Sequence, residues 1–274
     1  MYPYIEIGAL RIQTYHIFMI LGFAIALGVI LYLNKKHPLY HLPVKEILFL
    51  LVYVIVGALI GARIIFVLTN IGVMIEDPST ILPIIINGGL VFYGGVIGGI
   101  GMGYLYIRQY GLDPIKYSNL FIVAVPLGHG CGRVGCFMAG CCHGKPTDSI
   151  MGVVFDFDPS YPYHGVRVHP TQLYEAFFNI VLFVTMVTLF FKYRHKHRPY
   201  VFVSIYLVAY GVFRFINEFF RGDEIRGVFL LSTSQWISLL LIAAGVLLYV
   251  LKVERFKAFQ MQPPTAKNYQ NKTN

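Results

Sequence analysis

The sequence predicts an all-α integral membrane protein with seven transmembrane helices and a small extracytoplasmic loop region. Hydrophobic residues make up 57% of its 274 residues and charged residues only 13%, whereas soluble domains carry about 25% charged residues. The apolar residues also gather in runs, and a run of about 20 residues spans a bilayer. The seven runs cover residues 15–33, 47–69, 84–107, 117–133, 171–191, 200–220 and 229–251.

The connections between these runs alternate in charge, which orients the predicted helices. Lysine and arginine concentrate in segments 34–46, 108–116 and 192–198 and in the tail. Positively charged loops stay in the cytoplasm, so we expect the N-terminus outside and the C-terminus inside. The net charge of +9 then reflects topology, and we expect no nucleic-acid partner. We expect one membrane domain over 1–258 and a disordered cytoplasmic tail over 259–274.

The first three runs contain residues that hydropathy does not explain. Tyr15 opens the first run, where it could also belong to an interfacial aromatic belt. Arg63 lies deep in the second run, where an arginine either faces a polar cavity or snorkels outward. The third run contains the pairs Gly88-Gly89 and Gly94-Gly95. Such pairs favour an irregular backbone that lines a cavity, whereas glycines four residues apart favour helix packing.

The fourth run is the weakest, because Pro126 and several glycines interrupt it. It leads into the segment 128–144, which holds His129, Arg133, His143 and all four cysteines. The polar connection 136–170 that follows predicts an extracytoplasmic arm.

Three interpretations of the cysteines stay open: a metal site, a disulfide from Cys136 to Cys141 or Cys142, and packing of small side chains at a tight turn. The spacing lacks the Cys-x-x-Cys pairs of common zinc modules. We therefore expect no metal and no cofactor.

The last three runs add a polar stripe. Glu175 lies one turn inside the fifth run, and Gln235 lies near the start of the seventh. In the sixth run, Tyr210, Arg214 and Glu218 follow at intervals of four, with Arg221 three residues further on. These intervals place the side chains on one helical face. The stripe predicts either an anion site or a self-neutralising ladder that fixes packing.

Ordered motifs along most of the chain resemble those of the prolipoprotein diacylglyceryl transferase family. The motifs are Gly61-Ala62-Arg63, the Gly89–Gly95 segment, Gly132-Arg133-Val134-Gly135, His169-Pro170-Thr171-Gln172-Leu173-Tyr174-Glu175, Tyr210-Gly211-Val212-Phe213-Arg214-Phe215, Glu218-Phe219-Phe220-Arg221, and Ser232 with Gln235. The resemblance implies transfer of the diacylglyceryl group of phosphatidylglycerol to the cysteine thiol of a preprolipoprotein signal peptide, in the bilayer of the bacterial inner membrane. It maps the essential arginines onto Arg133 and Arg214 and the phosphate-neighbouring tyrosines onto Tyr15 and Tyr210.

The resemblance and the polar residues together give the expected site. We expect catalytic roles for Arg133, Arg214, Tyr93, His129 and His143. We expect substrate contacts from Tyr15, Arg63, Gly94, Gly95, Gly135, Cys136, Gly144, Glu175, Tyr210, Glu218, Arg221 and Gln235. Arginines in a water-poor site stabilise a departing phosphate, and their positive field favours the thiolate form of the acceptor. We expect no covalent enzyme intermediate.

The chain departs from the family pattern at three places. Tyr93 stands where the family has a histidine before a glycine pair, Cys136-Phe137 stands where it has Asn-Phe, and Ala139-Gly140-Cys141 stands where it has Asn-Gly-Glu. These departures leave open a paralogue that uses the same lipid donor with another acceptor. A non-enzymatic lipid or anion transporter is the rival from another class. Transport requires a polar path to both faces, yet the inner halves of the spans carry almost no charge.

Overall fold

A computed structural model describes residues 3–8, 10–156, 164–193, 199–222, 227–228 and 230–250. The expected tail at 259–274 and part of the expected arm, 157–163, lie outside these residues. The chain divides into two compact units. The first unit contains the described residues up to His41 and from Ser118 onward, and the second contains Leu42–Tyr117.

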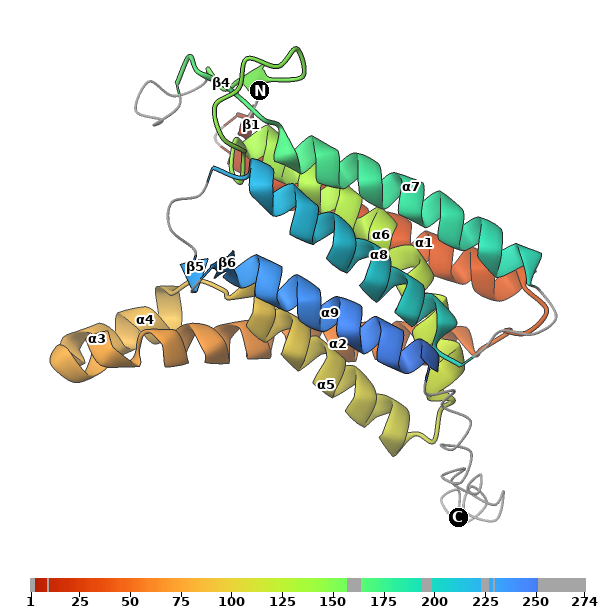
Figure 1. Cartoon of the computed structure of the whole chain (residues 1–274). Coiled ribbons are helices and arrows are strands. Elements are labelled where there is room, and N and C mark those ends of the chain that lie inside the picture. Colours follow the sequence, from red (N-terminus) through yellow and green to blue (C-terminus); the bar gives the residue numbers. More distant parts are fainter. Residues whose placement is uncertain are drawn as a thin grey trace. The chain divides into compact units, whose positions relative to one another are not determined.

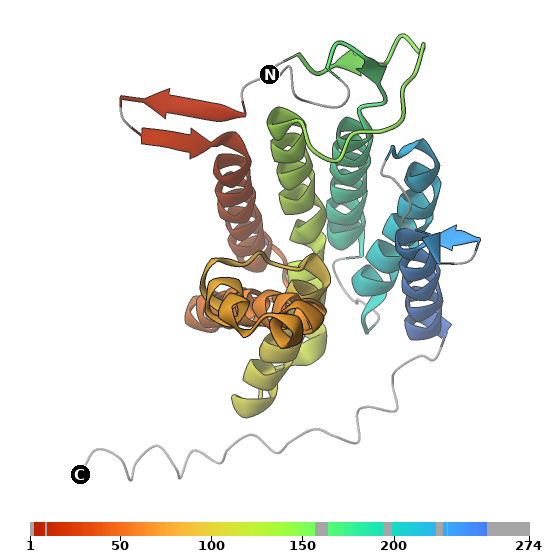
Figure 2. The same ribbon diagram turned by 90° about the vertical axis from the view of Figure 1, so that its left-hand side faces the viewer.

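Long helices run side by side in the first unit (Figures 1 and 2). In Figure 2 they follow one another across the view in the order α1, α6, α7, α8, α9. Their bounds are α1 Thr14–Lys36, α6 Pro114–Ala139 (in this unit from Ser118), α7 Thr171–Lys192, α8 Val201–Asn217 and α9 Thr233–Val250. A single 3-10 turn, η2 (Glu218–Phe220), continues α8.

In the described part of the first unit, three two-stranded antiparallel sheets add to the expected helices. They are β1 (Tyr4–Ile7) with β2 (Leu10–Gln13), β3 (Val153–Val154) with β4 (Arg167–Val168), and β5 (Gly227–Val228) with β6 (Leu231–Ser232). The β3–β4 hairpin lies within the polar connection between α6 and α7, and the β5–β6 hairpin leads directly into α9. The structure is therefore mostly helical, with strands confined to the connections and the N-terminal segment.

Aromatic packing and close helix contacts hold the first unit together. His37, at the end of α1, is fully buried, and its Nε2 lies 2.8 Å from the carbonyl oxygen of Phe190 in α7. Nearer the other end of α1, a Cβ on Gly22 would lie 2.9 Å from the carbonyl oxygen of Gly128 in α6. Only glycine permits this approach of the two backbones.

The second unit consists of α2 (Val44–Thr69), α3 (Ile71–Glu76), the 3-10 turn η1 (Pro78–Thr80), α4 (Ile81–Asn87) and α5 (Phe92–Gln109). Its two long helices, α2 and α5, touch along glycines. A Cβ on Gly94 would lie 2.4 Å from the carbonyl oxygen of Gly61, and one on Gly61 would lie 2.3 Å from that of Gly94. Here the glycines serve helix packing.

Six helices in the described part of the chain are long and apolar enough to cross a membrane: α1, α2, α6, α7, α8 with η2, and α9. The single run expected over 84–107 is wrong, because the helix breaks after Asn87 and resumes at Phe92. The break confirms the irregular backbone expected at Gly88-Gly89, whereas Gly94-Gly95 lies inside α5. The fourth run, expected to be the weakest span because of Pro126 and its glycines, forms one helix: α6 continues through Pro126 to Ala139, and the connection to α7 begins after that residue.

Candidate active site

A buried carboxylate joins three helices of the first unit. The side chain of Glu175 in α7 is only 1% exposed. Its Oε1 lies 3.1 Å from Nη2 of Arg133 in α6 and accepts a hydrogen bond of 2.9 Å from the Tyr210 hydroxyl of α8. The same oxygen lies 3.3 Å from Nε2 of His129, one helical turn before Arg133. We call these four residues the Glu175 cluster. Its carboxylate is well compensated, as a buried charge must be.

A second carboxylate lies where α8 ends. Glu218 opens η2, and its Oε2 lies 2.7 Å from Nη2 of Arg214 and 3.9 Å from Nε of Arg221. Its Oε1 accepts a hydrogen bond of 2.9 Å from the Ser232 hydroxyl, just before α9. We call these four residues the Glu218 cluster. Two guanidinium groups face one carboxylate, so the cluster carries a net positive charge.

Arg214 has hydrogen-bonding capacity that the protein does not use. Its Nη2 contacts Glu218 and also donates to the Ser234 hydroxyl at 3.0 Å. Its Nη1 is buried and has no hydrogen-bond partner among the described residues. Leaving a buried donor unsatisfied is costly, whereas an anionic oxygen beside it forms a strong charge-assisted hydrogen bond. Arg214 is thus arranged to receive an anion.

The two clusters adjoin along α8. Tyr210 belongs to the Glu175 cluster and lies one helical turn before Arg214. The structure therefore brings Arg133, Arg214, His129, Tyr210 and Glu175 into one polar region of the first unit.

Gln235 acts as part of a helix cap. Its Oε1 accepts a hydrogen bond from the Ser232 backbone N–H at 3.0 Å, and its own N–H donates to the Ser232 hydroxyl at 3.1 Å. This reciprocal pair is a capping box at the start of α9. Because the same hydroxyl donates to Glu218, the cap also fixes the second carboxylate.

Gly135 allows α1 to approach α6 beside Tyr15. A Cβ on Gly135 would lie 3.0 Å from Cβ of Phe18 and 3.3 Å from the carbonyl oxygen of Tyr15. Gly132, one turn earlier on α6, meets no atom within 4 Å in the same test. Close packing therefore explains the glycine at position 135 but not the one at position 132.

Gly144 fastens the connection after α6 to η2. A Cβ there would lie 2.4 Å from the carbonyl oxygen of Phe220 and 2.6 Å from Cβ of His169. Gly144 also pairs with Arg221 in an antiparallel bridge. The neighbouring His143 is half-buried, and its Nδ1 lies 2.9 Å from the carbonyl oxygen of Gly144. Gly144 thus holds the connection near the Glu218 cluster.

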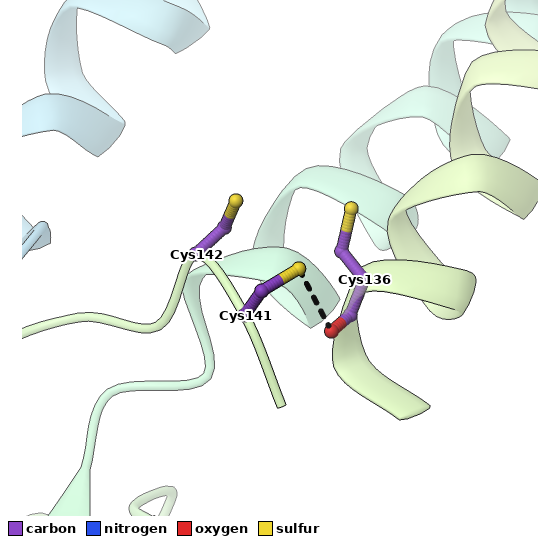
Figure 3. Close-up of side chains that lie close together, drawn as sticks. All are labelled: Cys136, Cys141 and Cys142. Atoms are coloured by element: carbon purple, nitrogen blue, oxygen red, sulfur yellow. Dashed lines mark hydrogen bonds between the residues drawn. The ribbon is translucent and has the colours of Figure 1, made fainter. Parts of the chain in front are cut away.

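Cys136 belongs to a group of three thiols. The sulfur atoms of Cys136, Cys141 and Cys142 all lie within 4.8 Å of one another (Figure 3). All three are free cysteines, and the Cys141 thiol contacts the Cys136 carbonyl oxygen at 3.6 Å. Hydrogen bonds from Cys136 and Cys141 lower the pKa of the Cys142 thiol, and Arg221 and Arg133 add to this effect.

Four expected site residues lie in the second unit. Arg63 of α2 donates to the carbonyl oxygens of Gly88, Gly89 and Ile86. These carbonyls are left without partners where α4 ends, so Arg63 closes that helix. Tyr93 is 42% exposed at the start of α5. Gly94 packs against α2, while a Cβ on Gly95 would meet only ordinary contacts from 3.4 Å upward.

Three residues that we did not assign to the site contribute to it. The Tyr206 hydroxyl lies 3.5 Å from Nδ1 of His129, and the Ser234 hydroxyl accepts a hydrogen bond from Arg214. The Gln172 amide donates a hydrogen bond of 2.6 Å to the Cys141 carbonyl oxygen. Tyr206 precedes Tyr210 by four residues, so extending the polar stripe by one turn finds it. No comparable spacing singles out Ser234 or Gln172.

The chain matches a family of known activity over nearly its whole length. A family model described as prolipoprotein diacylglyceryl transferase matches residues 3–251. A phosphatidylglycerol–prolipoprotein diacylglyceryl transferase of Clostridium tetani is 34% identical over 252 residues, which cover 92% of this chain and 97% of the relative. A second protein of that name, from Clostridium perfringens, is 32% identical, with 89% and 92% covered. A third, from Chlorobaculum tepidum, is 37% identical, with 73% and 72% covered.

Proposed function

Because this chain belongs to the prolipoprotein diacylglyceryl transferase family, we propose that it transfers the diacylglyceryl group of phosphatidylglycerol to the cysteine thiol of a prolipoprotein. This reaction is the first step of bacterial lipoprotein maturation. The chain is accordingly a multi-pass bacterial membrane protein. In our proposal the acceptor cysteine belongs to a signal peptide, the site opens to the extracytoplasmic leaflet, and the termini lie outside (N) and inside (C), in line with the distribution of basic residues.

The observation that carries the proposal is Nη1 of Arg214, which has no hydrogen-bond partner among the described residues. Nη1 is buried in a cluster of net positive charge, next to a guanidinium nitrogen already fixed by Glu218 and Ser234. Its geometry is therefore set before a substrate arrives, which is the condition for electrostatic catalysis. A phosphate oxygen of phosphatidylglycerol is the ligand that we assign to it.

In the proposed reaction the acceptor thiolate attacks the glycerol carbon that carries the phosphate ester. A carbon–sulfur bond forms, the carbon–oxygen bond breaks, and its electron pair leaves on the oxygen of glycerol phosphate. Arg214 donates a hydrogen bond to the departing phosphate. Arg221, whose Nε lies 3.9 Å from Oε2 of Glu218, adds a second positive charge. Positive charge in a water-poor site counts most when the leaving group develops its own negative charge.

We assign the thiol proton to His129. Glu175 orients its ring through Nε2 at 3.3 Å, while the contact of Nδ1 with the Tyr206 hydroxyl, at 3.5 Å, is long enough for an incoming thiol to replace it. A neutral imidazole held by a carboxylate is a suitable general base. His143 and Tyr93, the other candidates, have less support: Nδ1 of His143 contacts the carbonyl oxygen of Gly144, and Tyr93 lies in the second unit.

His129→Gln tests this assignment. We expect kcat to fall about 100-fold and the ascending limb of the pH–rate profile to disappear, because a general base contributes about 10²–10⁴. His143→Gln is the control and is expected to keep the pH profile of the parent protein. A profile unchanged by His129→Gln would remove His129 from the proton transfer.

The purified chain and a depletion strain test the proposed function together. With phosphatidylglycerol vesicles and a peptide carrying a signal-sequence cysteine, we expect a thioether product and glycerol phosphate. The same peptide with serine in place of cysteine is the matched control. Cells depleted of their own transferase should regain a lipidated reporter lipoprotein. No product in either assay, with good expression, would refute the proposal.

A second acceptor is favoured by one observation. Cys136 and Cys141 stand where the family pattern has asparagine and glutamate, so polar groups near the expected acceptor are altered. A small thiol offered in the same vesicle assay distinguishes the two cases. Lipidation of the small thiol but not of the peptide would identify a paralogue with the same lipid donor.

A further inference from the structure

Three thiols from two segments converge at the end of α6. Cys136 lies in the last turn of the helix, and Cys141 and Cys142 follow in the connection that turns back toward it. Their sulfur atoms lie within 4.8 Å of one another (Figure 3). Four bonds of about 2.3 Å to a tetrahedral zinc ion place the sulfur ligands about 3.8 Å apart. The three thiols therefore need only small movements to share one ion.

The backbone that presents these thiols is held in place from three directions. The Cys142 carbonyl accepts hydrogen bonds from the Thr171 hydroxyl at 2.9 Å and from Arg221 at 3.5 Å. The Cys141 carbonyl accepts one from the Gln172 amide at 2.6 Å, and the Cys141 N–H donates to the Cys136 carbonyl at 3.1 Å. These bonds fix the turn before any ligand binds. A site fixed in this way loses less conformational entropy on binding.

The backbone conformation of Cys142 is also typical of a ligand site. Its φ is +63°, in the left-handed region that residues other than glycine seldom adopt. Such strain persists only where the surroundings impose it, and it clusters at ligand sites.

The surrounding charges suit a metal held by three thiolates. Arg133 lies one turn before Cys136, and Arg221 contacts the Cys142 backbone. Two guanidinium groups repel a bare divalent cation but stabilise a complex of one divalent ion with three thiolates, whose net charge is −1. Cys136 is only 9% exposed, whereas Cys141 is exposed and gives an ion access to the site.

We propose that Cys136, Cys141 and Cys142 bind one thiophilic metal ion, for which Zn²⁺ is the probe, and leave its fourth coordination position open. Three protein ligands with one open position are the arrangement of reactive rather than purely structural zinc sites. Each thiol gives up its proton to solvent as its sulfur coordinates the ion. A disulfide would use two of the three sulfurs and leave the third without a role. The inference departs from the sequence-based expectation of no metal and does not depend on lipid transfer.

Metal content of the full-length protein in detergent tests the proposal. After loading with Zn²⁺ under reducing conditions and removal of loosely bound ion, we expect about one equivalent per chain. Cys131→Ser is the matched control, since Cys131 lies on the same helix but outside the group of three, and it should bind as much as the parent chain. The variant with serine at 136, 141 and 142 should bind none.

Two further measurements separate a specific site from other outcomes. Co²⁺ should give the intense thiolate-to-metal charge-transfer absorption of a sulfur-rich site, and Cys142→Ser should reduce it. Zn²⁺ should raise the melting temperature of the parent chain and of Cys131→Ser, but not that of the triple variant. Equal metal content in the parent and the triple variant would mean adventitious binding and overturn the proposal. So would a disulfide among the three cysteines, found by alkylation and mass spectrometry of protein isolated without an added oxidant.

Discussion

The two carboxylate clusters of the first unit look alike in composition but differ in how they are built. The Glu175 cluster joins residues of three helices, and Arg133, His129 and Tyr210 all contact one oxygen, Oε1 of Glu175. The partners of Glu218 are local: Arg214 precedes it by four residues, Arg221 follows by three, and Ser232 comes from the start of the next helix.

The difference separates structural from chemical roles. In the Glu175 cluster one carboxylate balances one guanidinium group, and the bonds link α6, α7 and α8. In the Glu218 cluster two guanidinium groups face one carboxylate, and Nη1 of Arg214 has no partner in the described chain. We therefore expect loss of the Glu175 carboxylate to appear mainly as instability and loss of Arg214 to appear mainly as lost transfer. Within the first cluster, His129, to which we assign the thiol proton, should also affect transfer directly.

Glu175→Ala should give the largest effect on stability. It leaves the Arg133 guanidinium group buried without its counter-charge, and breaking a buried pair in this way costs about 3–5 kcal/mol. Glu218→Ala should cost less, about 1–3 kcal/mol, because its two arginine partners lie four residues before it and three residues after it, so fewer contacts between helices are lost. Unfolding in mixed detergent micelles measures both. Equal losses would erase the distinction between the clusters.

Arg214→Lys should give the largest effect on transfer. Lysine can keep the charge contact with Glu218, but it cannot offer a second nitrogen in the place of Nη1. Losing one donor to a developing anion costs about 100-fold in kcat.

The control for Arg214→Lys is Arg133→Lys, in which one charged nitrogen still reaches Glu175. We expect a smaller loss of kcat, about tenfold, if a single charged hydrogen bond is kept. Transfer by vesicle assay and melting temperature should be measured on both. Arg214→Lys with full activity would remove the unpartnered nitrogen from the mechanism.

Part of this arrangement could be predicted from the sequence. The four-residue intervals of α8 place Tyr210, Arg214 and Glu218 on one face, and the structure keeps them there. The four-residue interval also predicts the pair of Arg214 with Glu218. It does not predict that Tyr210 binds Glu175, because partners on other helices have no fixed distance in sequence. Helical periodicity determines the face of one helix, and tertiary packing determines the partner.

The errors in the expected spans have local physical causes. A hydropathy average includes Gly88 to Leu90 in the apolar run and so does not detect the break after α4. Arg63 of α2 stabilises this break by donating hydrogen bonds to the carbonyl oxygens of Ile86, Gly88 and Gly89. Pro126 does not interrupt α6, because neighbouring groups in membrane helices can satisfy the carbonyl that a proline leaves unpaired. The approach of Cys141 and Cys142 to Cys136 depends on backbone angles at Gly140 and Cys142, which residue spacing does not encode.

Gly135→Ala should lower the stability of the protein moderately, because position 135 contacts α1. The new methyl group would lie 3.0 Å from Cβ of Phe18, so α1 must shift, at a cost of about 1–2 kcal/mol. Gly132→Ala has open space and should instead be neutral or stabilising, by up to about 1 kcal/mol. Thermal unfolding of the pair measures the difference. If the two alanines behave alike, the contact between α1 and α6 is looser than the structure shows.

Tyr206→Phe should have the smallest effect. Its hydroxyl meets His129 at 3.5 Å, the outer limit of a hydrogen bond, so its removal should cost no more than about 0.5 kcal/mol. Tyr210→Phe removes a bond of 2.9 Å to a buried carboxylate and should cost about 1.5–3 kcal/mol. Since both rings stack with a 5.7 Å separation, each variant keeps the aromatic packing and isolates its hydroxyl. A larger loss of stability for Tyr206→Phe than for Tyr210→Phe would contradict this. It would mean that the hydrogen bond to His129 stabilises the Glu175 cluster more than the hydrogen bond to Glu175 does.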